Sequence, residues 1–234
     1  MWNVKEYDTN NNVIYELENG KGFIKEFDDY YNIQFEGIYS NGEKNGIGKL
    51  YSNLGKLIFE GEYLNGIING KGKEYNANGE LIFEGDYLYN YRVKGKCYIN
   101  GRLEFEGDYL YNKKWSGKGY DENGNIIYEL INGNGKIIEY NMNGGLTFEG
   151  KYLNGKRDGK GKEYNIIGRL IFKGNFLNGK RNGKGKEYYS NGQLRFMGEY
   201  SKGKRNGRGY EYDINGNLIC KGFYINDIKK GNYK

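Results

Sequence analysis

Hydrophobic and polar positions alternate in short stretches that recur along the chain. In residues 81–87 the odd positions carry Leu, Phe, Gly and Tyr, and the even positions carry Ile, Glu and Asp. This two-residue period predicts a β-strand with one packed face. The glycine between the two aromatic positions leaves space on that face, which a ring from a neighbouring strand can fill.

Turn-forming residues follow each of these predicted strands. Residues 65–70 read Asn-Gly-Ile-Ile-Asn-Gly, and residues 178–183 read Asn-Gly-Lys-Arg-Asn-Gly. Asn and Gly tolerate positive φ, so these segments favour a chain reversal. A second strand and a second Asn-Gly turn come next, and each unit is therefore predicted to be an antiparallel hairpin that leads into the following one. Helix is disfavoured because each recurring glycine would cost a helix interior about 1 kcal/mol.

The hairpin unit repeats at a short and nearly constant period. The phenylalanines that begin successive units are Phe35, Phe59, Phe83, Phe105, Phe148, Phe172 and Phe196. Their sequence numbers rise in steps of 24, 24, 22, 43, 24 and 24, and Tyr128 divides the long step into 23 and 20. A fixed short period indicates a stack of small supersecondary units. We therefore expect an all-β fold, an elongated single-layer antiparallel sheet of about nine tandem β-hairpin units.

A second, longer repeat relates the two halves of the chain. When 113 is added to the residue number, Tyr15 falls on Tyr128 and Phe35 falls on Phe148. No linker composition separates the halves. We interpret residues 1–234 as a single array that is internally duplicated, at about 1–113 and 114–234.

The repeated string resembles the MORN repeat (membrane occupation and recognition nexus). It is carried by Phe-Glu-Gly-Glu-Tyr-Leu-Asn-Gly at residues 59–66 and by Phe-Glu-Gly-Lys-Tyr-Leu-Asn-Gly-Lys-Arg-Asp-Gly-Lys-Gly at residues 148–161. The resemblance implies an intracellular scaffold that tethers membranes, cytoskeletal components or signalling enzymes, often as a homodimer, and phosphoinositide affinity has been attributed to the family. The spacing is also similar to that of some bacterial toxin-neutralising proteins.

Composition concentrates the apolar mass in aromatic side chains. Hydrophobic residues make up 37% of the chain and aromatic residues 17%, with 40 glycines and no proline. We expect an aromatic face that holds a protein partner, made of Phe59, Tyr63, Phe83, Tyr87, Phe148, Tyr152, Phe172, Phe196 and Tyr200. No stretch has the length and hydropathy of a signal peptide or of a spanning helix, so we expect a cytoplasmic protein, at most peripheral to a membrane or the cytoskeleton.

The charge differs between the halves. Residues 1–113 hold 13 Lys and Arg against 18 Asp and Glu, whereas residues 114–234 hold 23 against 12. Much of the excess recurs at the period of the array and predicts a basic ridge, made of Lys156, Arg157, Lys160, Lys180, Arg181, Lys184, Lys204, Arg205 and Arg208. Such a ridge fits an anionic lipid or an acidic protein; equally, solvated lysines at an edge prevent aggregation. Nucleic acid is disfavoured because the tyrosines recur at packing positions. Opposite net charges also allow head-to-tail pairing in a homodimer.

The sequence lacks the residue types and motifs that catalysis or metal binding usually requires. The chain has no histidine, which removes the usual general base and the usual zinc ligand. The basic, glycine-rich segment at residues 155–161 lacks the spacing of a phosphate-binding loop. Residues 121–125 and 213–217 are similar to a calcium loop, but Ile126 and Leu218 stand where such a loop requires glycine. We expect no catalytic residues, no metal and no cofactor.

Three functions remain in order of preference. The first is a non-catalytic scaffold that binds protein partners through the aromatic face. The second is an adaptor that binds phosphoinositides or other anionic lipids through the basic ridge. The third, for a bacterial chain, is an antitoxin-like inhibitor.

Overall fold

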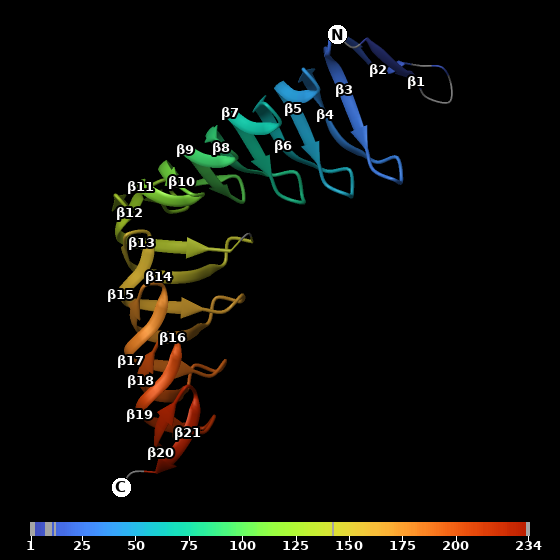
Figure 1. Cartoon of the computed structure of the whole chain (residues 1–234). Helices are drawn as coiled ribbons and strands as arrows, with labels where there is room; N and C mark the ends of the chain where they lie inside the picture. The colour runs from blue at the N-terminus through green and yellow to red at the C-terminus, as the bar shows by residue number, and fades with distance from the viewer. Residues whose placement is uncertain (1–2, 8–10, 12, 142, 233–234) are drawn as a thin grey trace. The chain divides into compact units, whose positions relative to one another are not determined.

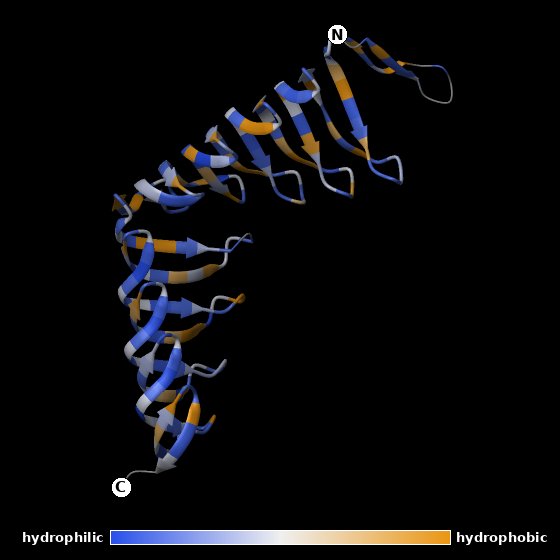
Figure 2. Ribbon diagram, in the orientation of Figure 1, coloured by the Kyte–Doolittle hydropathy of each residue, from blue (hydrophilic) through white to orange (hydrophobic). Residues whose placement is uncertain are grey.

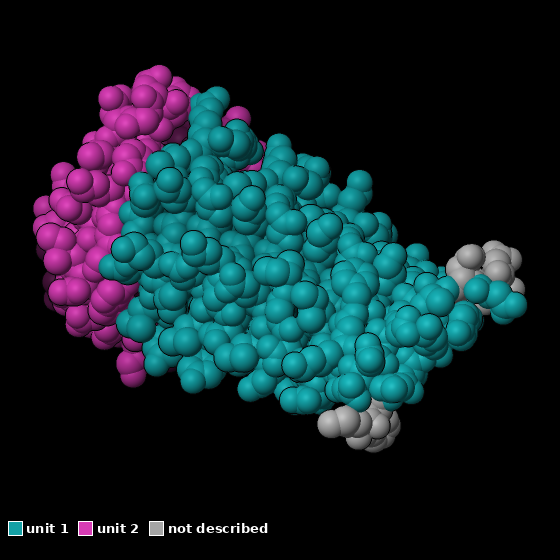
Figure 3. Space-filling view, turned by 90° about the horizontal axis from the view of Figure 1, so that it is seen from above, with its two compact units in different colours: residues 1–113 teal, residues 114–234 magenta. Residues whose placement is uncertain are grey.

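The computed structural model describes residues 3–7, 11, 13–141 and 143–232, and in that part of the chain the regular structure is all β-strand. The described residues contain no helix that is long and apolar enough to span a bilayer. The chain divides into two compact units, Met1–Lys113 (unit 1) and Lys114–Lys234 (unit 2) (Figure 3). The division falls at the boundary of the sequence duplication.

Unit 1 is built from ten short strands (Figure 1). They are β1 (Val4–Tyr7), β2 (Val13–Glu18), β3 (Lys21–Phe27), β4 (Ile33–Ser40), β5 (Glu43–Tyr51), β6 (Leu57–Leu64), β7 (Ile67–Tyr75), β8 (Leu81–Leu88), β9 (Tyr91–Ile99) and β10 (Arg102–Leu110).

Unit 2 repeats the arrangement with eleven strands. They are β11 (Lys113–Tyr120), β12 (Ile126–Ile131), β13 (Asn134–Tyr140), β14 (Leu146–Leu153), β15 (Lys156–Tyr164), β16 (Leu170–Leu177), β17 (Lys180–Tyr188), β18 (Leu194–Ser201), β19 (Lys204–Tyr212), β20 (Leu218–Ile225) and β21 (Ile228–Asn232).

Within each unit every strand pairs antiparallel with the next strand in sequence, as β6 does with β7 and β7 with β8. The Asn-Gly turns supply the reversals: Asn65 and Gly66 have φ of 49° and 81°. This double positive φ gives the turn the twist that joins antiparallel strands, and Asn and Gly tolerate it best. The all-β fold of tandem antiparallel hairpins, predicted from the sequence, is confirmed.

In six of the repeats, those that begin at Phe35, Phe59, Phe83, Phe148, Phe172 and Phe196, the core is a phenylalanine ring lying over two glycines. An ideal Cβ on Gly174 would lie 2.7 Å from the Cζ atom of Phe172, and one on Gly185 would lie 2.5 Å from it. Only glycine leaves this space, so the predicted ring-over-glycine packing is confirmed. Phe172 also meets Phe176 and Tyr200 edge to face, with ring centroids 5.5 and 5.2 Å apart.

This packing changes the interpretation of the aromatic face. Phe172 has 0% exposed surface, and its neighbours in the array are nearly as buried. The expected aromatic face is buried at Phe59, Tyr63, Phe83, Tyr87, Phe148, Phe172, Phe196 and Tyr200 and half-buried at Tyr152. These residues form the hydrophobic interior of the hairpins. They were expected to form the face that holds a protein partner, but most of their surface is used in packing within the fold.

Candidate functional site

The face of the sheet opposite the rings is hollowed in unit 2. A groove of about 1050 Å³ crosses β12 to β19, and glycines such as Gly161, Gly174 and Gly185 are among the residues that line it. Because the Cβ direction of these glycines is occupied by rings, the residues beside them project to the other face. Lys173 and Asn175, on either side of Gly174, line the groove in this way. Figure 2 shows hydrophobic and hydrophilic residues interspersed along the strands.

Three lysines stand side by side across the groove of unit 2. Lys162 on β15 is the register partner of Lys173 on β16, which is in turn the partner of Lys186 on β17. We call Lys162, Lys173 and Lys186 the lysine row. Adjacent strands lie about 4.8 Å apart, and like charges directly opposite each other destabilise a sheet.

One member of the lysine row is neutralised within the fold. Lys162 forms an ion pair with Glu149, its register partner on β14. The hydrogen bond from Lys162 holds the pKa of Glu149 below its ordinary value, and the same contact raises the pKa of Lys162. Lys173 and Lys186 are exposed, and the described carboxylates form no ion pair with either.

Unit 1 shows the same face with its charges balanced. Register partners across β3 to β10 alternate strictly in sign, in the order Lys25, Glu36, Lys49, Glu60, Lys73, Glu84, Lys96 and Glu106. We call this set the charge ladder. Glu36 lies 3.9 Å from Lys25 and 3.7 Å from Lys49. Opposite charges directly across a sheet stabilise it, so the ladder is a compensated arrangement.

The ladder carboxylates also accept hydrogen bonds from tyrosines. Tyr75 donates its hydroxyl to Glu60 at 2.6 Å. Burial and this hydrogen bond raise the pKa of Tyr75 to about 12. Under the duplication, Tyr188 corresponds to Tyr75 and Lys173 to Glu60, so unit 2 has no carboxylate at that place.

The two grooves therefore differ in charge on the same backbone. At equivalent places of the duplication, Ile138 of unit 2 stands for Lys25, but six groove positions of unit 2 are more basic or lack a carboxylate: Lys136 for Phe23, Lys151 for Ile38, Lys160 for Ile47, Lys173 for Glu60, Asn175 for Glu62, and Met197 for Glu84. Among the described residues, the groove of unit 2 is lined by eight Lys and Arg against two Glu. The groove of unit 1, of about 560 Å³, has five Lys against four carboxylates.

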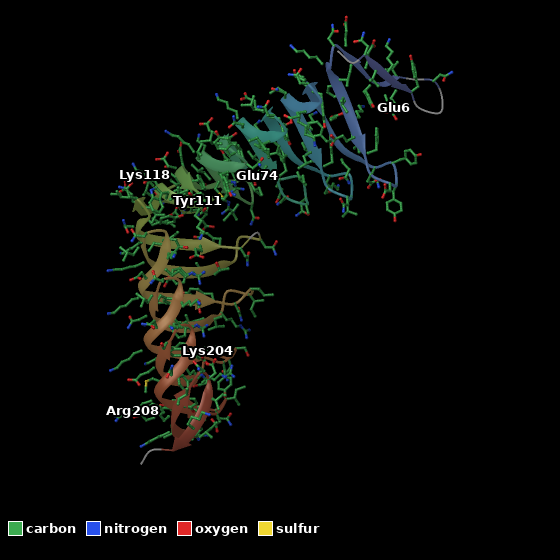
Figure 4. All side chains as sticks on the ribbon, in the orientation of Figure 1. Glu6, Glu74, Tyr111, Lys118, Lys204 and Arg208 are labelled. Carbon is green, nitrogen blue, oxygen red and sulfur yellow. The ribbon has the colours of Figure 1, made fainter. Side chains whose placement is uncertain are left out.

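The nine residues of the expected basic ridge occupy three different environments. Lys156, Lys180 and Lys204 are the first residues of β15, β17 and β19 and are exposed. Lys160, Lys184 and Arg208 line the groove of unit 2. Figure 4 labels Lys204 and Arg208 on the same strand. Arg157, Arg181 and Arg205 turn to the ring side, so the nine residues do not form one ridge.

Each ring-side arginine stacks on a phenylalanine and bonds carboxylates. The Arg205 guanidinium carbon lies 4.1 Å from the centre of the Phe196 ring. Its nitrogens bond Glu187 and, at 2.9 Å, Glu211, while Tyr200 donates to Glu187 at 3.0 Å. Burial pushes the pKa of Glu187 upward, but the hydrogen bonds and charge of Arg205 outweigh it, and this pKa lies below its ordinary value. These arginines thus hold neighbouring hairpins together.

The repeat at Phe59 replaces this polar network with apolar residues. Leu50 stands where Glu74 stands one repeat later, and Ile68 stands where Arg92 stands. The Tyr63 hydroxyl is consequently buried without a hydrogen-bond partner. Tyr87, one repeat later, donates to Glu74 at 2.6 Å.

Metal-binding side chains are not gathered in the described residues. No group of three or more His, Cys, Asp or Glu residues there is placed to hold a metal ion. Cys97 and Cys220 form no disulfide within the described residues. The groove of unit 2 is lined mainly by charged residues, with lysine ammonium groups as its main polar feature.

Comparison with protein families fits this geometry. Five segments match the family model described as MORN repeat, at residues 35–53, 59–80, 148–165, 172–194 and 196–218. The chain is a MORN-repeat protein. MORN repeats are generally found in scaffold or membrane-associated proteins, and the family is typically non-enzymatic.

Comparison with other proteins adds little to the MORN assignment. No curated protein matches the sequence. Solved structures with some similarity include "Crystal Structure of TcdB2-TccC3 without hypervariable C-terminal region" (11% identity, TM-score 0.26) and "Crystal Structure of TcdB2-TccC3-Cdc42" (13% identity, TM-score 0.20). The matches cover 94% of this MORN chain but only 15% and 13% of those chains.

Proposed function

We propose that this MORN protein is a non-catalytic scaffold that binds a protein partner on the groove face of its repeats. The observation that carries the proposal is the difference between the two faces. The rings are used in internal packing, as the 0% exposure of Phe172 shows. The opposite face is open, with backbone on its floor and charged side chains along it. A partner therefore meets the glycines and lysines, and the rings hold that surface in shape.

Site-specific photocrosslinking tests this proposal. A benzoylphenylalanine placed at Asn175 in the groove is compared with one at Ile166, an exposed loop residue outside it. In cells that express the full chain, the groove position is expected to give discrete protein adducts that the loop position does not give. Equal adduct patterns from the two positions contradict a groove-specific scaffold, and so does the absence of adducts at Asn175.

A second candidate is binding to anionic lipid, and the exposed lysines at the strand starts favour it. Lys156, Lys180 and Lys204 recur at the array period in unit 2. Each basic residue near an acidic leaflet contributes about 1 kcal/mol. Replacing all three with Ser is expected to abolish flotation with phosphoinositide liposomes at physiological salt. Wild-type protein that ignores such liposomes even at low salt rejects this candidate.

A further inference from the structure

We infer that the groove of unit 2 is the site for an acidic segment of a protein partner, and that the groove of unit 1 is not. The inference rests on the proposed scaffold function and names the chemistry of its partner. It commits to a stretch of Asp and Glu residues that places carboxylates over Lys162, Lys173 and Lys186.

The first support is the cost of the lysine row to the fold. Each like-charged pair directly across two strands destabilises the sheet, and the row contains two such pairs, Lys162 with Lys173 and Lys173 with Lys186. Glu149 compensates only Lys162. The remaining positive charge is balanced by no ion pair within the described fold, so a bound anion would supply the missing compensation.

The second support is the internal comparison that the duplication provides. Unit 1 has the same order of strands, glycines at the equivalent positions, and an alternating ladder at the same register positions, including Glu60 and Glu84. The fold can therefore hold a row in which every lysine lies opposite a carboxylate. In unit 2, Lys173 and Met197 stand at the places of two of these carboxylates. The ring pairs remain alike in the two units: the centroids of Phe59 and Tyr87 lie 5.4 Å apart, and those of Phe172 and Tyr200 lie 5.2 Å apart.

The third support concerns the class of partner. The lysines do not stand alone: Ile138, Tyr188 and Met197 line the same groove. Methionine adapts its shape to varied apolar groups, and a glycine floor lets another chain approach closely. Carboxylates together with apolar side chains on one ligand describe a segment of protein better than a lipid headgroup. A membrane surface would instead meet the exposed lysines at the strand starts, such as Lys180.

The experiment measures binding of a fluorescein-labelled peptide of about ten glutamates to the full chain by fluorescence anisotropy. The main variant is K173E with M197E, which gives the groove of unit 2 the sign pattern of the ladder. We expect its affinity to fall about tenfold or more, because cross-interface charge pairs are lost and replaced by repulsion. The milder K173Q is expected to lose less. Unchanged far-UV circular dichroism establishes that each variant is folded.

Two further variants make the test specific. The turn variant K156S/K180S/K204S removes three cations outside the groove, and we expect less than about a twofold change. The reciprocal variant E60K/E84M, added to the weakened protein, is expected to restore binding, now in unit 1. If the turn variant loses peptide binding and K173E/M197E keeps it, the inference is wrong.

Vesicles of phosphatidylcholine and phosphatidylserine form the final arm. If the wild type binds these vesicles through the lysine row and ignores the glutamate peptide, the groove is a lipid site and the inference is wrong. The scaffold proposal fails on a different readout, the protein adducts at Asn175. If the protein does not bind the glutamate peptide but still gives adducts at Asn175, the inference of an acidic segment is wrong and the scaffold proposal stands.

Discussion

Replacing Lys173 with Glu should stabilise unit 2 while it weakens binding. The substitution converts two like-charged register pairs, with Lys162 and with Lys186, into two oppositely charged pairs. It also returns a carboxylate to the position from which Glu60 accepts the Tyr75 hydroxyl in unit 1.

The expected increase in the free energy of unfolding follows from the two register partners of Lys173. A cross-strand charged pair contributes about 0.2 to 1 kcal/mol, and the change of sign acts on two pairs. Lys173 is exposed, so solvent screening keeps each contribution toward the lower end. One hydrogen bond adds about 0.5 to 1.5 kcal/mol. We therefore expect the free energy of unfolding to rise by about 1 kcal/mol, and by less at high salt.

Urea unfolding followed by tryptophan fluorescence measures this change. Trp115 reports on unit 2, where it packs against Gly133, and Trp2→Phe is introduced into every protein to remove the other signal. Lys180→Glu is the control, because it makes the same charge change at a strand start outside the lysine row. A gain no larger than that of Lys180→Glu, or a loss, would refute the reasoning.

Three other predictions test the packing of the hairpins. Arg205→Ala is expected to cost about 2 kcal/mol in urea unfolding, since half-buried Glu211 loses its arginine and Glu187 keeps only Arg181 at 3.6 Å. Lys204→Ala, at the neighbouring exposed position, should cost under about 0.5 kcal/mol, and similar losses at both sites contradict the assigned roles. Tyr63→Phe removes a hydroxyl that has no hydrogen-bond partner and should leave the stability unchanged or raise it, whereas Tyr87→Phe should cost about 1 to 2 kcal/mol. A lower thermal midpoint for Tyr63→Phe than for Tyr87→Phe refutes this account. The pKa of Glu187 in the folded protein is lowered from 4.5, so its carboxylate stabilises the fold above pH 4.5 and loses this effect as the pH falls below that value. Glu187→Gln should make the thermal midpoint fall less steeply as the pH is lowered, and an unchanged pH dependence of the thermal midpoint contradicts this prediction.

The hairpins and their glycines could be predicted because both follow from local patterns. Period-two alternation, Asn-Gly turns and a fixed repeat determine strand, reversal and stacking without knowledge of distant contacts. The position of Gly174 between rings is an example, since only its lack of a side chain permits the approach of Phe172.

The candidate site was harder to predict because it depends on which strands lie side by side. Arg181 has the same parity as the ring-side Gly185, so its inward direction was present in the sequence, but the adjacent Lys180 suggested a common ridge. The lysine row joins Lys162, Lys173 and Lys186, which lie on three successive strands, and only the pairing register brings them together. The rings are buried because residues of the next repeat cover them, and the two-residue period within one strand does not show which residues those are.

Lysine footprinting tests the central claim most directly. The full chain is acetylated lightly with and without saturating glutamate peptide, and each lysine is quantified by mass spectrometry. The account predicts protection of Lys173 and Lys186 in the groove and unchanged labelling of Lys156, Lys180 and Lys204. Protection of the strand-start lysines with none at Lys173 and Lys186 would contradict the claim that the groove of unit 2 is the binding site.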